Sequence, residues 1–196
     1  MEPMAAENPD IIMSRLDPFK WLSPQSRKRI WLASLIISAA LLSAMNLLDV
    51  ALKTAAAPSG IISFEFAGNM VNAQRMLASW DADARVHAAL SLGIDYLFLV
   101  AYALVISMAC AHTANTLRRR FKAAAAIGFV LAWAQFLAAG LDAVENAALI
   151  RLLLGSSHSF YPLVAWVCAG IKFGLVGLGL AYLPVGFILG RLVRRS

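Results

Sequence analysis

The stretch AAAAIGFVLAWAQFLAAGLDAVENAALI, residues 123–150, decides the fold. It is longer than the roughly 20 apolar residues that a helix needs to cross the hydrocarbon core of a bilayer. Asp142, Glu145 and Asn146 interrupt it, and their spacing of three and four residues places all three on one helix face. Ionisable groups at membrane depth are costly and usually face a bundle interior or a water-filled cavity. The stretch therefore predicts a membrane helix whose polar face belongs to the working part of the protein.

Four apolar stretches of this kind occupy most of the 196 residues. Hydrophobic residues make up 61% of the chain and charged residues 14%, whereas a soluble domain is typically about 45–50% apolar and about a quarter charged. We therefore predict an all-α fold, a polytopic membrane four-helix bundle with no separate soluble domain. The expected parts are a lead at 1–29, one membrane domain at 30–190 with spans near 30–52, 94–113, 123–150 and 162–189, an outer loop at 53–93, and a tail at 191–196.

The outer loop is too long to lack structure in a compact protein. Apolar residues recur there at positions 70, 73, 77 and 80, which is a helical period. We therefore expect an amphipathic helix over the outer mouth of the bundle, either as a functional lid or as a simple anchor in the headgroup region. Asp81 or Asp83 would cap a further helical stretch that runs into the second span. In the lead, residues 11–22 form either a short helix on the membrane surface or a frayed tail.

The net charge is +6, and the basic residues are distributed unevenly between the two sides of the predicted bundle. Twelve of the seventeen Lys and Arg residues lie in the lead, in the loop between the second and third spans, and in the tail. By the positive-inside rule, this asymmetry places both termini on the cytoplasmic side of the inner membrane. A basic surface for nucleic acid would not be divided among membrane loops in this way, so no nucleic-acid partner is expected.

The sequence also argues against a cleaved signal peptide, a disulfide and a metal site. The first apolar run is longer than the roughly 7–15 residues of a signal-peptide core, so an uncleaved helix is expected. Cys110 and Cys168 fall at opposite ends of their spans, too far apart for a disulfide. His87, His112 and His158 are scattered among loops and span ends, so no metal site is expected. No motif identifies a cofactor.

The charged residues of the four spans fall at one depth. Counted at about 1.5 Å per residue from its own basic anchor, each lies roughly 28–34 Å away, near the outer edge of a hydrocarbon core about 30 Å thick. These residues are Asp49, Asp95, Asp142, Glu145 and Lys172. Tyr102 shares a helix face with Asp95, as Asn146 does with Asp142. The pattern predicts one polar layer inside the bundle.

Secondary candidates lie on the same faces and in the outer loop. They are Asn46, Asp49, Arg75, Trp80 and Gln135. Four acids against Lys172 would leave excess negative charge, unless Arg75, Arg85 or Arg151 reach in or some of the acids are protonated. The sequence does not say whether Lys172 pairs with Asp142, Glu145 or Asp95.

Three segments stand out within this layer and beside it: FEFAG at 64–68, LGIDYLFL at 92–99 followed by Tyr102, and LDAVEN at 141–146. With them the chain resembles a group of bacterial four-helix integral membrane proteins of unassigned function. The resemblance covers about residues 30–189 and carries no activity with it. It implies only that one site contains Glu65, Asp95, Tyr102, Asp142, Glu145 and Asn146.

Three interpretations of the polar layer remain open. Lys172 paired with an acid could simply clamp the third and fourth spans together. Alternatively, the layer lines an outward pocket for a membrane lipid or another amphipathic molecule. Glu145 or Asp95 would then act as acid/base or as hydrogen-bond acceptor, and Lys172 would hold an anionic group. An ion path ranks third, because the lower halves of the second and third spans are nearly all apolar.

The fourth span carries Gly170-x-x-x-Gly174, a spacing that lets membrane helices approach each other closely. These glycines are expected to pack within the bundle; otherwise they form a homo- or hetero-oligomer interface. On that second interpretation the protein is a non-enzymatic subunit or assembly factor of a larger membrane complex. The sequence does not decide whether the protein is an enzyme.

Overall fold

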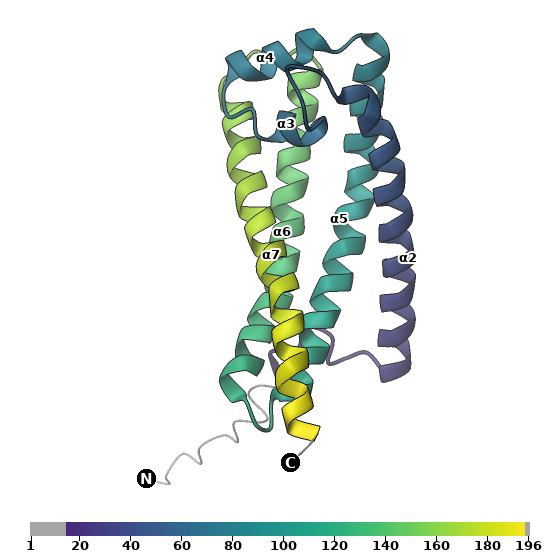
Figure 1. The fold of residues 1–196 in the computed structure, drawn as a ribbon, viewed down its shortest axis with the longest axis vertical. Coiled ribbons are helices and arrows are strands. Elements are labelled where there is room, and N and C mark those ends of the chain that lie inside the picture. The colour runs from purple at the N-terminus through teal and green to yellow at the C-terminus, as the bar shows by residue number, and fades with distance from the viewer. Residues whose placement is uncertain (1–14, 195–196) are drawn as a thin grey trace.

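The computed structural model describes residues 15–194, with side chains up to Arg191. The predicted all-α bundle is confirmed. Its four long helices are α2 (Pro24–Asp49, continued by the short η1, Val50–Leu52), α5 (Ala82–Leu117), α6 (Lys122–Leu153) and α7 (Phe160–Arg194). All four are long and apolar enough to cross a membrane, as in a multi-pass membrane protein. The start of α2 and the end of α7 lie at the same end of the bundle (Figure 1).

Local sequence accounts for the ends of these helices. Ser23 caps α2 by accepting a hydrogen bond from the Ser26 amide, and Pro24 occupies the first turn. Asp81 caps α5 through the Ala84 amide at 2.8 Å, which confirms one of the two expected caps. Gly155 follows α6 with a φ of 91°, a left-handed conformation that glycine adopts without strain. Helix α5 thus begins well before residue 94, and the outer loop ends at Asp81.

Helices α5, α6 and α7 form the packed core, and α2 lies beside α5 (Figure 1). Ser34 is the only buried residue of α2, and the Trp31 indole attaches this helix to the Val105 carbonyl at 3.1 Å. In the core, Tyr182 of α7 lies against Gly128 of α6 and donates to the Ala124 carbonyl at 3.0 Å. The first long helix is therefore peripheral.

The outer loop folds into two short helices, α3 (Ile61–Glu65) and α4 (Met70–Ser79), which cover one end of the bundle (Figure 1). We call this the cap end and the opposite end the basic end. The expected amphipathic helix is α4; Asn69 caps it through the Asn72 amide. Trp80 holds the loop down, because its ring lies 5.2 Å from that of Phe64 and its indole donates to the Leu52 carbonyl. Helix α3 was not predicted, because five residues are too few to show a periodicity.

The glycines of α7 divide between the two sides of that helix. A Cβ at Gly179 would meet Gln135, and one at Gly186 would meet Thr113, so these two pack within the bundle. A Cβ at Gly170 or Gly174 would meet no atom within 4 Å among the described residues. The expectation that Gly170 and Gly174 pack inside the bundle is therefore wrong, because their face points away from α5 and α6.

Two further expectations concern the cysteines and the lead. Cys110 and Cys168 are both free and buried. The choice between a surface helix and a tail for residues 11–22 lies partly outside the described residues. Residues 16–23 form turns rather than a helix.

Candidate functional site

Lys172 of α7 is the centre of the polar layer. Its Nζ atom lies 2.6 Å from Asp142 Oδ1 and 3.0 Å from Glu145 Oε1, both on α6, and 3.8 Å from Glu65 Oε2 on α3. All four side chains are buried. The structure thus pairs Lys172 with Asp142 and Glu145 together, and adds a carboxyl group from outside the long helices.

Asp95, Tyr102 and Asn146 extend this cluster on the α5 side. The Tyr102 hydroxyl donates to Asp142 Oδ2 at 3.0 Å, and the Asn146 amide donates to Asp95 Oδ2 at 2.6 Å. Asp142, Glu145 and Asp95 therefore each have a neutral or cationic donor that partly satisfies them. The seven primary candidates of the sequence come together here, with α3, α5, α6 and α7 all contributing.

Helix α3 places Glu65 within this cluster, and Asp49 positions α3. Asp49 Oδ1 accepts a hydrogen bond from the Ile61 amide at 2.7 Å, at the first residue of α3. Gly60 precedes it with a φ of 56°, and a Cβ there would collide with the Asp49 carboxylate. Asp49 therefore belongs to the turn rather than to the Lys172 cluster, and its other oxygen lies 3.6 Å from Lys53.

The charges of the cluster do not balance if every acid is ionised. Arg75, Arg85 and Arg151 are exposed and do not reach the cluster. The expectation that these arginines neutralise the excess acids is therefore wrong. Among residues 15–194, no donor forms a hydrogen bond with Glu65 Oε2 or Glu145 Oε2, although the two carboxyl groups are within hydrogen-bonding reach of each other. A proton on one of them would supply the missing donor.

Glu65 is the member of the cluster that lies outside the long helices. Burial raises the pKa of its carboxyl group from 4.5 to about 7, because the charged form loses its hydration. Nearby Lys172 opposes this shift, while Asp95 and Asp142 reinforce it. Glu65 can therefore exchange a proton near neutral pH.

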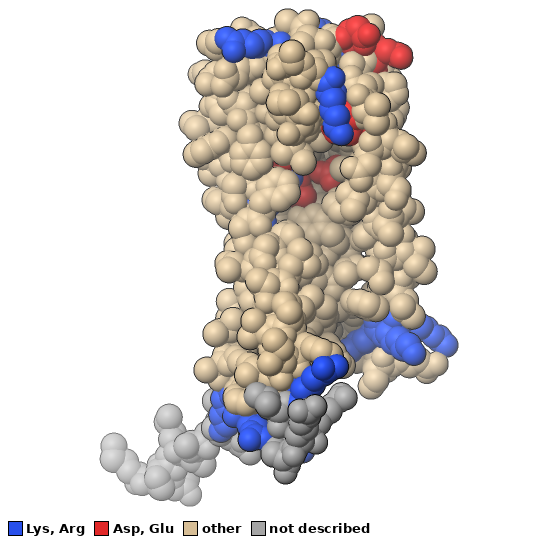
Figure 2. All heavy atoms as spheres, in the orientation of Figure 1, with Lys and Arg blue, Asp and Glu red and all other residues tan. Residues whose placement is uncertain are grey.

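A cavity of about 400 Å³ lies against the cluster, bordered by α2, α3, α5 and α7. Glu65, Asp95, Asp142 and Lys172 form its polar floor; its other walls are largely apolar, with Leu42, Phe98, Ile106, Val176 and Leu180. Figure 2 shows carboxylates at the bottom of a hollow on the face that α7 and α2 border. Glu145 and Asn146 are fully buried and do not line the cavity, so a molecule in it would meet the other polar members of the cluster rather than these two.

The secondary candidates lie in different parts of the structure. Asn46 and Asp49 line the cavity. Trp80 is part of the loop packing described above, and Arg75 is exposed on α4. Gln135 is buried away from the cavity, where its amide donates to the carbonyls of Leu131 and Leu175. The sequence analysis did not predict the aromatic wall of the cavity, which contains Phe98 and Phe173. Phe98 lies one helical turn after Asp95, and Phe173 directly follows Lys172.

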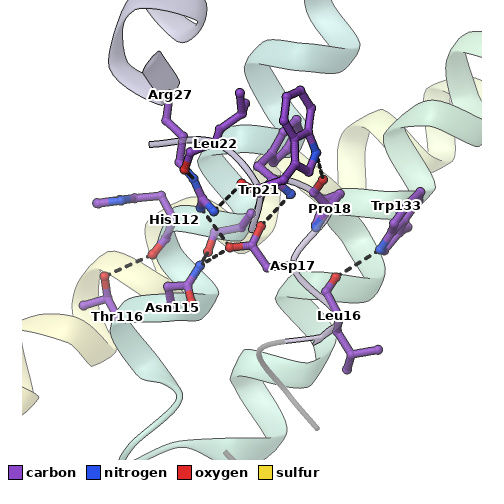
Figure 3. Close-up of polar contacts among 12 residues, drawn as sticks. Leu16, Asp17, Pro18, Trp21, Leu22, Arg27, His112, Asn115, Thr116 and Trp133 are labelled. Atoms are coloured by element: carbon purple, nitrogen blue, oxygen red, sulfur yellow. Dashed lines mark hydrogen bonds and ion pairs between the residues drawn. The ribbon is translucent and has the colours of Figure 1, made fainter. Parts of the chain in front are cut away.

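A second buried polar cluster lies at the basic end and was also missed (Figure 3). Asp17 accepts from Arg27 at 2.8 Å and from Asn115 of α5 at 2.9 Å, and it also accepts from the Phe19 amide. The Leu16 carbonyl accepts from the indole of Trp133 on α6. The only signal in the sequence is that Asp17 is the single acid in the basic stretch from Arg15 to Arg29.

The comparisons with known proteins add no relative to this picture: no family model, no curated protein and no solved structure matches the chain. Within residues 15–194, no three His, Cys, Asp or Glu side chains are arranged to hold a metal ion. The chemistry of the site itself is therefore the only guide to function.

Proposed function

We propose that the protein binds a lipid-like or amphipathic molecule in the cavity between α2, α3, α5 and α7. The single observation that carries this proposal is the combination of an acidic floor with apolar walls in one cavity of about 400 Å³. Ligand pockets have volumes of roughly 300–1,000 Å³, with few polar groups that fix orientation. An apolar chain would lie along Leu42, Val176 and Leu180, with its polar end against the carboxyl groups.

The polar end of this ligand donates hydrogen bonds. Lys172 already contacts Asp142, Glu145 and Glu65, so it has little capacity left for an anionic group, which was its expected role. The oxygens of Glu65, Asp95 and Asp49 are acceptors when ionised. A hydroxyl or amine headgroup matches this surface better than a phosphate or carboxylate does.

Retention of the ligand tests the proposal. After gentle extraction in a non-ionic detergent, native mass spectrometry of the wild-type protein should show a co-purifying amphiphile. Asp95→Asn and Glu65→Gln should each lower its retention roughly tenfold, which is the worth of one hydrogen bond to a charged group. Asp83→Asn is the matched control, because Asp83 is an exposed acid of α5 outside the cavity. Equal retention in all three variants would contradict a cavity ligand.

We also infer that the basic end faces the cytoplasm and that the membrane is the inner membrane, since Lys and Arg concentrate at that end. Single cysteines at Arg119 and Ser59 should then react with an impermeant thiol reagent from opposite sides. Labelling of both from one side would refute this orientation.

A second function, as a subunit of a larger membrane complex, is favoured by one observation. Gly170 and Gly174 are exposed on α7 with open space where a Cβ would be. Such a face permits a partner helix to approach closely. Gly170→Leu should then abolish a stoichiometric partner in the detergent extract; a wild-type protein that purifies without any partner argues against this function.

A further inference from the structure

A second cavity, of about 800 Å³, lies at the basic end between residues 17–24, the start of α2 and the last turns of α5. It is separate from the proposed ligand cavity, with which it shares no lining residue. Its rim is cationic, with Lys20, Arg27, Lys28 and Arg118, and contains His112. Its deeper wall is apolar, with Phe19, Trp31 and Met108.

The one acid on its lining, Asp17, does not neutralise this rim. Asp17 is 6% exposed and both of its oxygens are occupied, one by the Phe19 amide and the other by Arg27 and Asn115. The Arg27 guanidinium also donates to the carbonyls of Phe19 and Leu22, so its donors are directed at the protein. Asp17 and Arg27 therefore form a closed pair that builds the wall.

Three charged side chains remain available. Throughout the described part of the chain, no side-chain hydrogen bond or ion pair involves Lys20, Lys28 or Arg118. They belong to three different segments, namely the loop before α2, the first turns of α2 and the end of α5. Three unbalanced positive charges around one opening form a site for an anion.

The Asp17 cluster makes this opening a preformed feature. The indole of Trp133 on α6 donates a hydrogen bond to the Leu16 carbonyl (Figure 3). The ring of Phe19 packs 6.1 Å from that of Phe136. The Trp31 indole is fixed to the Val105 carbonyl. A binding site whose walls are already ordered loses less conformational entropy when it is filled.

We propose that this cavity binds an anionic phospholipid, with its phosphate between Lys28, Lys20 and Arg118 and an acyl chain along Phe19, Trp31 and Met108. Two features select a lipid over a soluble phosphate. The apolar wall adjoins the cationic rim in the same cavity, and the rim lies at the end of helices long enough to span the bilayer. Basic pockets between membrane helices are known to suit lipid phosphates.

The test is a titration of the purified full-length protein in a non-ionic detergent. Phosphatidylglycerol should bind tighter than phosphatidylcholine of the same chain length, and its affinity should fall with added salt. The double variant Lys28→Gln/Arg118→Gln should lose roughly 30-fold in affinity for phosphatidylglycerol. The matched control Arg75→Gln/Arg151→Gln removes two exposed cations from the cap end and should bind like the wild type.

Two further measurements keep the result interpretable. If the double variant does not fold, Lys20→Gln alone should lose roughly fivefold in affinity, since this exposed side chain holds nothing in place. Phosphatidylglycerol with brominated chains should quench tryptophan fluorescence, and Trp31→Phe should remove part of this quenching. Equal affinity for the two lipids, or for wild type and Lys28→Gln/Arg118→Gln, would overturn the proposal. Competition by inorganic phosphate as strong as by the lipid would also overturn it, in favour of a soluble anion.

Discussion

The two ends of the bundle each bury one ion among charges of the opposite sign. At the cap end, Lys172 lies among the carboxyl groups of Asp142, Glu145 and Glu65. At the basic end, Asp17 lies beside Arg27, on a lining with Lys20, Lys28 and Arg118. The surroundings differ, however: the partners of Lys172 are all buried, whereas Arg27 is 28% exposed. Because water can replace a partner only where it has access, the same arrangement should be far more costly to disturb at the cap end.

Removal of the Lys172 charge should have the largest effect. Lys172→Met leaves up to four carboxyl groups without a cation in a poorly hydrated site, and breaking a buried pair costs about 3–5 kcal/mol. The free energy of unfolding in detergent, measured with a chemical denaturant, should fall by this amount. A second change, Glu145→Gln or Asp142→Asn, should recover part of the loss, since direct coupling makes the two effects non-additive. A silent Lys172→Met, or no recovery by either second change, would show that the polar layer is not one unit.

The pH dependence of stability should differ between wild type and Glu65→Gln. The pKa of Glu65 is about 7 in the folded protein against 4.5 in the unfolded chain, so the folded state binds more protons between these values. Stability therefore falls as pH rises from about 4.5 to about 7, by on the order of 3 kcal/mol. Glu65→Gln should lack this loss, while Asp83→Asn should keep it. Parallel curves for wild type and Glu65→Gln would rule out this titration.

Asp17→Ala should cost less than Lys172→Met. It removes the acceptor of Arg27, Asn115 and the Phe19 amide, and donors left without a partner cost about 1–3 kcal/mol where water is excluded. Since water reaches Arg27, we expect about 2 kcal/mol by the same denaturation measurement. A loss as large as that of Lys172→Met would mean that the two ends are equally dry.

The smallest expected effect is that of salt on the cost of Asp17→Ala, which should differ from its effect on the cost of Lys172→Met. Raising the ionic strength from 0.1 to 1 M shortens the Debye length from about 10 to about 3 Å, which weakens exposed charge interactions far more than buried ones. The cost of Asp17→Ala should decrease by less than about 1 kcal/mol, and that of Lys172→Met should not change. A salt-dependent cost at Lys172 would indicate that ions enter the cap-end cavity.

The sequence predicted the cap end better than the basic end for a physical reason. Depth along a membrane helix is proportional to residue number, so Asp95, Asp142, Glu145 and Lys172 could be placed at one level from their anchors alone. The cap of α5 could be narrowed to Asp81 or Asp83, because capping depends on neighbouring residues. These are properties of single helices, and the structure adds only the rotation and pairing of the helices.

What could not be predicted depends on chain segments that turn back. Glu65 entered the candidate site through a resemblance and not through any depth argument, because a five-residue helix has no measurable period. Asp49 has the expected depth, yet it binds the Ile61 amide because the loop returns to it. The contact of Asp17 with Asn115 joins residues 98 positions apart, and no local pattern reports such a contact.

The peripheral position of α2 has a consequence for biosynthesis. Chains leave the ribosome from the N-terminus, so α2 enters the bilayer before any helix that it contacts. With Ser34 as its only buried residue, it can wait in lipid without a partner. Lys172 lies on α7, which is made after α5 and α6 with Asp95, Asp142 and Glu145. The carboxyl groups are therefore synthesised before the lysine, so Lys172 can pair with them as soon as α7 packs against α6.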